Sequence, residues 1–248
     1  MKRFLLLLAI AAVSVFMIAG CKKSAEESNK LVVGLNAEFP PFEYKEANGN
    51  IVGFDVDLMN EIGKLINKEI EYKNMSFDSL LIAIQSGKID ISISGMTATD
   101  ERRQVVNFST PYFVSKQAIL TRTDSTITNF DDLTGKTIGV VLGYTGDLAV
   151  TEKYKDTANI IKFDSGDQLI LALNSKKMDV AVIDMEPAKK YVEFNQGLKL
   201  VETPLAEEEY SIAIPKGKEQ LVEDINKALE TLKSNGTYDT IYKKYFKD

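Results

Sequence analysis

The sequence predicts an α/β protein with two lobes, each built on a mostly parallel sheet, and a hinge of two strands between them. Short apolar segments alternate along the chain with segments of helical periodicity, which is typical of β-α-β units. The same order of elements starts again after Thr121, so the chain contains two similar halves. Repeated β-α-β units place helices on both faces of each sheet.

Apolar residues in the first half recur with the periods of strands and helices. Residues 31–35 (LVVGL) form a short apolar run that predicts a strand, and residues 55–66 show helical spacing. Aspartate is favoured at helix N-caps, so Asp55 is expected to cap this helix. The elements expected after it are a strand at 69–74, a helix at 78–86 and a strand at 89–94.

The second half repeats this order and is followed by a return segment. Its expected elements are strands at 137–141, 159–163 and 180–183, and helices that start near Thr145 and span 166–175. A strand-like segment at 210–215 and helices at 219–234 and 238–246 end the chain. If this C-terminal segment returns to the first half, the first lobe is discontinuous in sequence. The chain then crosses between the lobes twice, and two crossing strands are a common hinge for domain closure. We therefore expect lobe 1 at 31–111 and 213–248, lobe 2 at 117–207, and the hinge at 112–116 and 208–212.

The first residues predict export. Two basic residues precede an apolar run from Phe4 to Val13, and small residues lead to Cys21, which is the pattern of a signal peptide at 1–20. A membrane span is the alternative, but this run is at the short end of the roughly 20 residues that a span needs. Residues 18–21 (IAGC) resemble the bacterial lipobox, which implies acylation of Cys21, the only cysteine in the chain. Several acyl chains anchor a protein stably, and polar residues 22–30 then act as a flexible tether.

The charge and the residue types exclude several classes of protein. Cleavage before Cys21 removes two of the 30 basic residues and none of the 36 acidic ones, so the net charge changes from −6 to −8. Nucleic acid is therefore excluded as an expected partner, because phosphate binding requires a basic face. The chain has no histidine, which excludes Ser-His and Cys-His catalysis and histidine-metal sites. No cofactor and no metal are expected.

Three motifs resemble the amino-acid-binding extracytoplasmic solute receptors of ABC importers. They are residues 36–44 (NAEFPPFEY), 52–58 (VGFDVDL) and 94–103 (SGMTATDERR). The similarity continues through 108–112, 179–184 and 235–238, in the order that the family shows. The resemblance implies a type II periplasmic binding protein fold that closes like a Venus flytrap, a membrane permease as partner, and a monomer outside the cytoplasm that is held to a membrane by the lipid on Cys21.

The family's carboxylate-binding groups match residues in both halves. The resemblance implies that Arg102 binds the α-carboxylate of a free amino acid, and a planar guanidinium suits this because it makes two parallel hydrogen bonds. Thr97 and Thr145 match the hydroxyl donors to the same carboxylate. The backbone groups of Ser94 and Gly95 are expected to face the ligand at the carboxyl edge of the first sheet. The alternative for Arg102 is an exposed helical residue like its neighbour Arg103.

Other matched residues concern the ammonium group and the ligand side chain. The resemblance implies that Asp184 pairs with the α-ammonium, although it is also a candidate N-cap for a following helix. Phe39 and Phe54 match two aromatic residues that sandwich the ligand side chain, with plain core packing as the alternative. The family often has an acid where this chain has Asn36. That difference concerns ligand specificity.

The preferred ligand is expected to be arginine or lysine. The motif at 36–43, together with 143–147 (GYTGD), is similar to members that bind basic amino acids. Glu38 is expected to be the acid partner of a buried cation. Glutamine is the alternative ligand, because an aromatic sandwich also accepts a flat amide. A dehydratase acting on amino-acid precursors is the alternative class, because this fold also carries such enzymes. We expect binding without catalysis, since Arg102 and Asp184 account for both charges of a zwitterion without a reaction.

Overall fold

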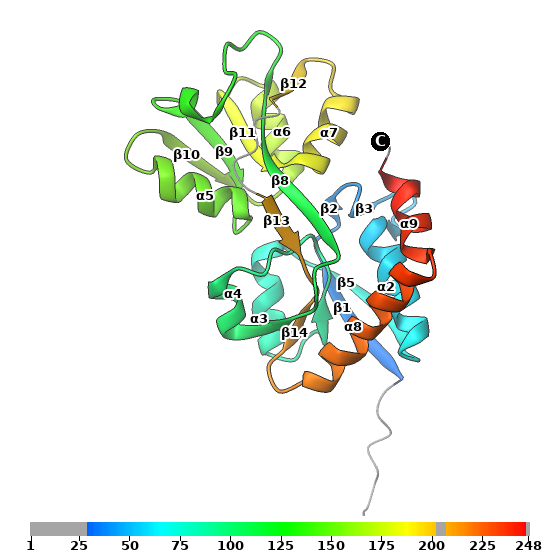
Figure 1. The fold of residues 1–248 in the computed structure, drawn as a ribbon. Coiled ribbons are helices and arrows are strands. Elements are labelled where there is room, and N and C mark those ends of the chain that lie inside the picture. Colours follow the sequence, from blue (N-terminus) through cyan, green and yellow to red (C-terminus); the bar gives the residue numbers. More distant parts are fainter. Residues whose placement is uncertain (1–28, 202–206, 247–248) are drawn as a thin grey trace, which may run out of the picture.

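The computed structural model describes residues 29–201 and 207–246, which form two α/β lobes (Figure 1). The expected signal peptide at 1–20 and the expected acylation site, Cys21, lie outside the described residues. Within the described ranges, none of the helices combines the length and the apolar character that crossing a membrane requires.

The sheet of lobe 1 contains strands from both ends of the described chain. Its order is β5 (Glu69–Asn74), β1 (Lys30–Leu35), β6 (Ile91–Ser92), β14 (Ala213–Pro215) and β7 (Val106–Phe108). β1 runs parallel to β5 and β6, whereas β14 runs antiparallel to β6 and β7, so the sheet is mixed. The return of β14 makes the first lobe discontinuous in sequence.

Helices cover both faces of this sheet. On one side lie α2 (Phe54–Leu65), α8 (Glu219–Ser234) and α9 (Thr237–Tyr245), and on the other α3 (Leu80–Gln85) and α4 (Asp100–Val105) (Figure 1). The buried residues Leu31 and Val33 of β1 pack with the first group of helices. α8 is strongly amphipathic, with Ile225, Leu229 and Leu232 buried, as expected for a helix with one face on the core.

The sheet of lobe 2 has the order β10 (Asn159–Phe163), β9 (Thr137–Val141), β11 (Val180–Asp184), β8 (Phe113–Arg122) and β12 (Leu198–Val201). β10 and β11 run parallel to β9, and β8 runs antiparallel to β11 and β12. α5 (Thr145–Tyr154) covers one face, and α6 (Gly166–Asn174) and α7 (Met185–Phe194) cover the other. Because side chains alternate along a strand, Val180 and Val182 face α5 while Ala181 and Ile183 face α6 and α7.

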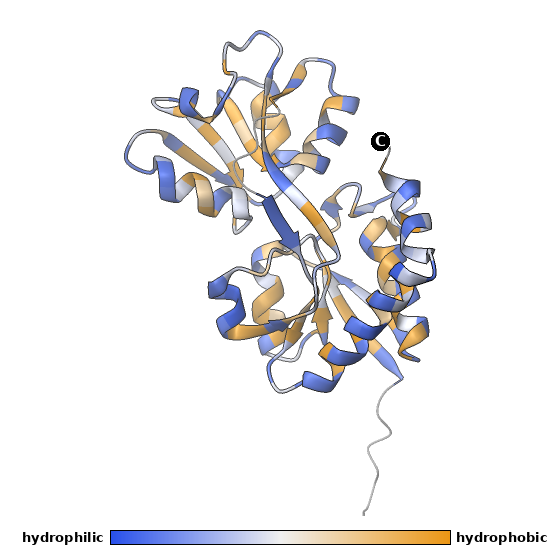
Figure 2. Ribbon diagram, viewed as in Figure 1, coloured by the Kyte–Doolittle hydropathy of each residue, from blue (hydrophilic) through white to orange (hydrophobic). Residues whose placement is uncertain are grey.

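A two-stranded ribbon connects the lobes. β13 (Glu207–Tyr210) pairs antiparallel with the start of β8, with Glu208 opposite Ser115 and Tyr210 opposite Phe113. Figure 2 shows β13 as hydrophilic, in contrast to the hydrophobic central strand β11 of lobe 2. A small third sheet, β2 (Glu38–Phe39), β3 (Glu43–Lys45) and β4 (Ile51–Val52), lies at the edge of lobe 1 that faces lobe 2 (Figure 1).

Some local predictions differ from the structure, and one is the strand expected at 89–94, of which only Ile91–Ser92 forms β6. The N-cap of α2 is Gly53, not Asp55, and the buried Asp55 carboxylate instead accepts hydrogen bonds from Gly95 N and Tyr112 Oη. The expected strand at 210–215 is divided into β13 and β14. The expected helix at 78–86 starts with a 3₁₀ turn at Phe77–Ser79 before α3. For Asp55 and for the divided strand, contacts with distant segments decide the local structure.

Candidate ligand-binding site

Polar side chains from both lobes and the ribbon meet where strands of both sheets end. Thr97 follows β6, Thr145 follows β9 as the first residue of α5, and Asp184 is the last residue of β11. Glu208 reaches the same place from β13. Ligands of open α/β sheets bind at the carboxyl ends of the strands, so this is the candidate site.

Arg102 is buried at this site, with 8% of its surface exposed. Its Nη1 donates to the Thr97 carbonyl and its Nη2 donates across the lobes to the Gly143 carbonyl, both at 2.8 Å. The guanidinium carbon lies 5.3 Å from the ring centroid of Phe77. Burial lowers the pKa of Arg102, while the charges of Glu208 and Asp184 act in the opposite direction. The alternative of an exposed residue is wrong for Arg102 and holds for Arg103.

The two expected hydroxyl donors share one carboxylate. Thr97 Oγ1 donates to Glu208 Oε2 at 3.0 Å, and Thr145 Oγ1 donates to the same oxygen at 2.6 Å. Glu208 is buried. Sequence reasoning did not select it for the site, because it stands in a run of three glutamates. The structure therefore shows that these hydroxyls can hold a carboxylate between the lobes.

Asp184 is buried and accepts a hydrogen bond from Tyr210 Oη at 2.5 Å. Asp184 stands at the N-cap position of α7, as the alternative expected, but its side chain makes no capping hydrogen bond, so the cap does not account for its carboxylate. Burial, with the nearby Glu208, raises the pKa of Asp184 to about 7. A cation placed beside Asp184 would favour the ionised form.

Gln117 is a further polar group of the site that sequence reasoning missed. Its Nε2 donates to Thr145 Oγ1 at 3.2 Å, whereas its buried Oε1 has no hydrogen-bond partner among the described residues. Buried acceptors are nearly always satisfied, so this oxygen is suited to a donor supplied by a ligand. No sequence pattern marks Gln117, because residues 113–117 (FVSKQ) do not alternate between apolar and polar, and the alternation in burial along β8 appears only in the structure.

An aromatic compartment lies beside these polar groups. Phe39 and Phe77 both contact the ring of Tyr144, with centroid distances of 5.4 and 4.7 Å. Tyr144 Oη donates to Asn36 Oδ1 across the lobes at 3.0 Å. Of these residues, Phe39 and Asn36 were expected at the site, and Phe77 and Tyr144 were missed. The amide of Asn36 is held in place because its Nδ2 donates to the Met75 carbonyl.

Phe54 does not form the second aromatic wall, so this prediction is wrong. It is fully buried in an aromatic cluster of lobe 1, with its ring 5.1 Å from Phe246 and 5.7 Å from Tyr238. As the first residue of α2, Phe54 packs beneath α9. The core alternative holds for this residue, and Phe77 is the aromatic side chain that lies near Phe39 through Tyr144.

Ser94 and Gly95 are turned partly into lobe 1. Ser94 Oγ donates to Glu43 Oε1 and accepts from Asn36 N, and Gly95 N donates to Asp55 Oδ2. The expectation that the Gly95 N–H faces the ligand is therefore wrong. Burial raises the pKa of Asp55 to about 6, and burial together with Asp55 raises the pKa of Glu43. This buried network fixes the loop from which Thr97 and Arg102 follow.

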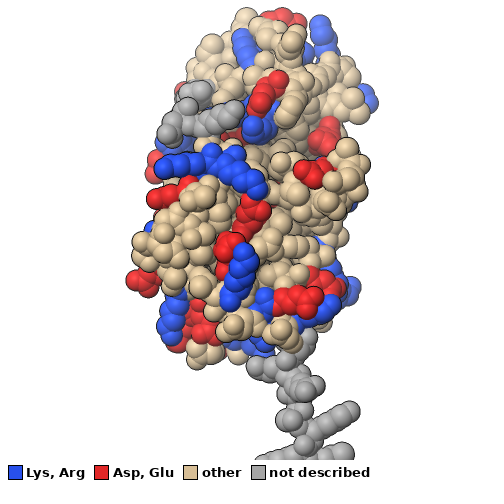
Figure 3. Space-filling model, turned by 90° about the vertical axis from the view of Figure 1, so that its right-hand side faces the viewer, with Lys and Arg blue, Asp and Glu red and all other residues tan. Residues whose placement is uncertain are grey.

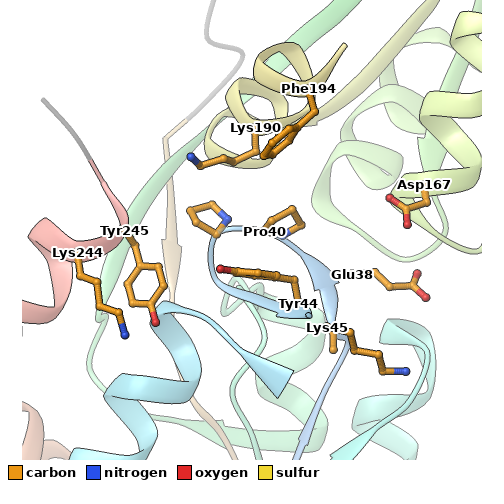
Figure 4. Close-up of a pocket in the computed structure, with 11 residues that line it drawn as sticks. Glu38, Pro40, Tyr44, Lys45, Asp167, Lys190, Phe194, Lys244 and Tyr245 are labelled. Atoms are coloured by element: carbon orange, nitrogen blue, oxygen red, sulfur yellow. The ribbon is translucent and has the colours of Figure 1, made fainter. Parts of the chain in front are cut away.

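Glu38 lies outside the cluster around Arg102. Neighbouring residues in a strand point to opposite sides, and in β2 Phe39 faces the aromatic compartment while Glu38 faces an outer pocket of about 690 Å³. Figure 4 shows Glu38 and Asp167 on one side of this pocket and Tyr245 and Lys244 on the other. The prediction that Glu38 is the acid partner of a buried ligand cation is not supported by this position.

Charges of both signs are interspersed over the face drawn in Figure 3, where neither sign covers a broad continuous area.

Comparison with known proteins identifies the family. Residues 31–248 match the model of the bacterial extracellular solute-binding proteins, family 3. A probable histidine-binding protein of Neisseria gonorrhoeae is 41% identical over 219 residues, which cover 86% of this chain and 82% of the relative. The arginine-binding extracellular protein ArtP of Bacillus subtilis (strain 168) is 37% identical over 257 residues, which cover 99% of this chain and 98% of ArtP.

Solved structures agree with this result. The structure of an ancestral arginine-binding protein bound to arginine is 44% identical and has a TM-score of 0.85, over 88% of this chain and 99% of that chain. The predicted two-lobed fold class is thereby confirmed, with mixed rather than mostly parallel ladders in each sheet. The chain belongs to family 3 of the bacterial extracellular solute-binding proteins.

Proposed function

We propose that this protein captures free arginine, or another basic amino acid, outside the cytoplasm and delivers it to an ABC-transporter permease without chemical conversion. The observation that carries the proposal is the meeting of buried Arg102, buried Asp184 and two threonine hydroxyls between the lobes. A free amino acid has one group of each charge, and buried charges require partners of opposite sign. Arg102 with the hydroxyls suits the carboxylate, and Asp184 with Gln117 Oε1 suits the ammonium.

The side-chain compartment supports arginine as the ligand. The rings of Phe39 and Phe77 offer flat surfaces to a planar guanidinium, and a cation over an aromatic face gains about 0.5 to 2 kcal/mol. Asn36 Oδ1 is an acceptor inside this compartment and suits a guanidinium N–H. ArtP and the ancestral arginine-binding protein give the same indication through what their names say they bind.

The lobes close by a change in the ribbon, with the hinge at 112–116 and 208–212 and the lobe boundaries expected from the sequence. Closure buries the charged groups around the ligand and presents one closed shape to the permease. The proposed anchor is lipid on Cys21, and the proposed state is a monomer. Mass spectrometry of the N-terminal peptide tests the anchor, and a Cys21→Ser variant should be released from membranes.

The direct test is isothermal titration calorimetry of ligand-stripped protein with all twenty amino acids. Arginine should bind most tightly, with lysine next and glutamine weaker. Glutamine binding at least tenfold tighter than arginine would overturn the ligand assignment. Chromatography of the bound amino acid and of a panel of amino-acid precursors after incubation should recover them unchanged, and release of a converted product would instead support the dehydratase alternative.

A further inference from the structure

Tyr144 fills the compartment assigned above to the ligand side chain. Its ring lies against Phe39 and Phe77, with interplanar angles of 90° and 66°, and only 6% of Tyr144 is exposed. Its Oη donates to Asn36 Oδ1. The ring packs edge-on or tilted against both aromatic side chains rather than stacked on them. It nevertheless occupies the space beside them, and its hydroxyl occupies the Asn36 oxygen that would suit a guanidinium N–H.

Glu208 takes the corresponding position at the carboxylate end. Its Oε2 accepts hydrogen bonds from both Thr97 and Thr145, the two hydroxyls assigned to the ligand carboxylate. Both arrangements join the lobes, because Tyr144 and Thr145 belong to lobe 2, while Asn36 and Thr97 belong to lobe 1. Arg102 completes the closed arrangement by donating to the carbonyl of Gly143, the residue before Tyr144.

We propose that Tyr144 and Glu208 act as an internal substitute for the ligand, which closes the empty protein and must leave the site before an amino acid binds. This inference rests on the proposed function. Tyr144 covers the side-chain compartment and Glu208 covers the carboxylate position. A ligand must displace both residues, and this displacement lowers its affinity for the site. Ligands that restore more of these contacts, as arginine does on Asn36 and the aromatic rings, replace Tyr144 best.

The local backbone suits such a movement. Gly143 has φ of +78°, a left-handed conformation that glycine adopts readily, and the turn places Tyr144 at the N-cap of α5. Leu142, on the same turn, is exposed. Tyr144 therefore leaves the compartment through rotation of its side chain and this turn, without disruption of the buried faces of β9 or α5.

The energetic consequence is a penalty on ligand affinity. When part of the empty population is self-occupied, the apparent dissociation constant rises in inverse proportion to the fraction that can bind. Loss of the Tyr144 hydroxyl removes one hydrogen bond from the self-occupied form, so Tyr144→Phe should tighten arginine binding about fivefold. Removal of the ring in Tyr144→Ala should tighten it about tenfold or more.

The experiment combines calorimetry with small-angle X-ray scattering. Tyr144→Phe, Tyr144→Ala, Glu208→Gln and the Tyr144→Ala/Glu208→Gln double variant are titrated with arginine, with Leu142→Ala and Glu209→Gln as controls on the same turn and the same strand. Leu142 and Glu209 are both exposed. Without ligand, the double variant should have a larger radius of gyration than the wild type. On addition of arginine it should contract more than the wild type does.

Each outcome decides the proposal. Tighter arginine binding in the Tyr144 and Glu208 variants, with unchanged controls, supports it. Unchanged or weaker arginine binding in the Tyr144 variants or in the Glu208 variant overturns the proposal, because the substituted residue then does not compete with the ligand. Equal ligand-free radii of gyration for the wild type and the double variant also overturn it, and this comparison needs no ligand. Absence of amino-acid binding by the wild type would instead overturn the proposed function.

Discussion

Replacement of Arg102 by alanine is the sharpest test of the site. The side chain is 8% exposed, and its two hydrogen bonds to the Thr97 and Gly143 carbonyls hold the guanidinium between the lobes. Loss of one partner of a desolvated charge pair costs about 2 to 5 kcal/mol of binding free energy. We therefore expect the arginine affinity of Arg102→Ala to fall roughly 30- to 5,000-fold.

Arg103→Ala is the matched control, because Arg103 follows Arg102 in the same helix and is exposed. Its side chain donates to the Ala98 carbonyl, which lies just before this helix. Both variants are titrated with arginine by calorimetry, after thermal unfolding has shown a cooperative transition. The control should bind within about threefold of the wild type, in keeping with an exposed residue outside the site. Wild-type affinity in Arg102→Ala would refute the assignment of Arg102 to the ligand carboxylate.

Three further predictions follow from the burial and position of individual residues. Arginine affinity should fall about tenfold for each pH unit below 7 and be flat above pH 8, because the pKa of Asp184 is raised to about 7 and ligand binding requires the ionised carboxylate. Asp184→Asn should abolish this pH dependence. Calorimetry at several pH values would contradict the reasoning if the wild-type affinity did not change with pH. In the ligand-free protein the same carboxyl makes folding less favourable as pH rises from about 4 to about 7, because its folded pKa lies above its unfolded value. Phe77→Leu should weaken arginine binding about tenfold. Phe54→Leu should leave the arginine affinity unchanged and lower the free energy of unfolding by about 1 kcal/mol in urea titrations. Weaker binding in Phe54→Leu with unchanged binding in Phe77→Leu would restore Phe54 as the aromatic wall of the ligand site. Glu38→Gln should leave arginine affinity within about threefold, since Glu38 lies in the outer pocket, and a larger loss on titration would return Glu38 to the site.

Sequence periodicity was sufficient for most of the elements and for the order of the two lobes. Apolar strand segments such as 31–35 and 180–183 are buried on both faces, and this requirement appears directly as continuous apolar runs. β13 was not recognised as a separate strand because its glutamates carry no apolar pattern. Only its hydrogen bonds to β8 make it a strand, and that pairing joins residues distant in sequence.

The family, the two-lobed fold and the charged groups that suit a zwitterion could be predicted from the sequence, because Arg102 and Asp184 occur in motifs that resemble the family. Which side chains lie beside these charged groups became known only from the folded structure. Phe54 and Phe77 are equally aromatic in sequence, but α9 buries Phe54 while the Phe77 ring reaches Arg102 and Tyr144. The position of a side chain relative to a site depends on packing between distant segments, which local sequence patterns do not encode.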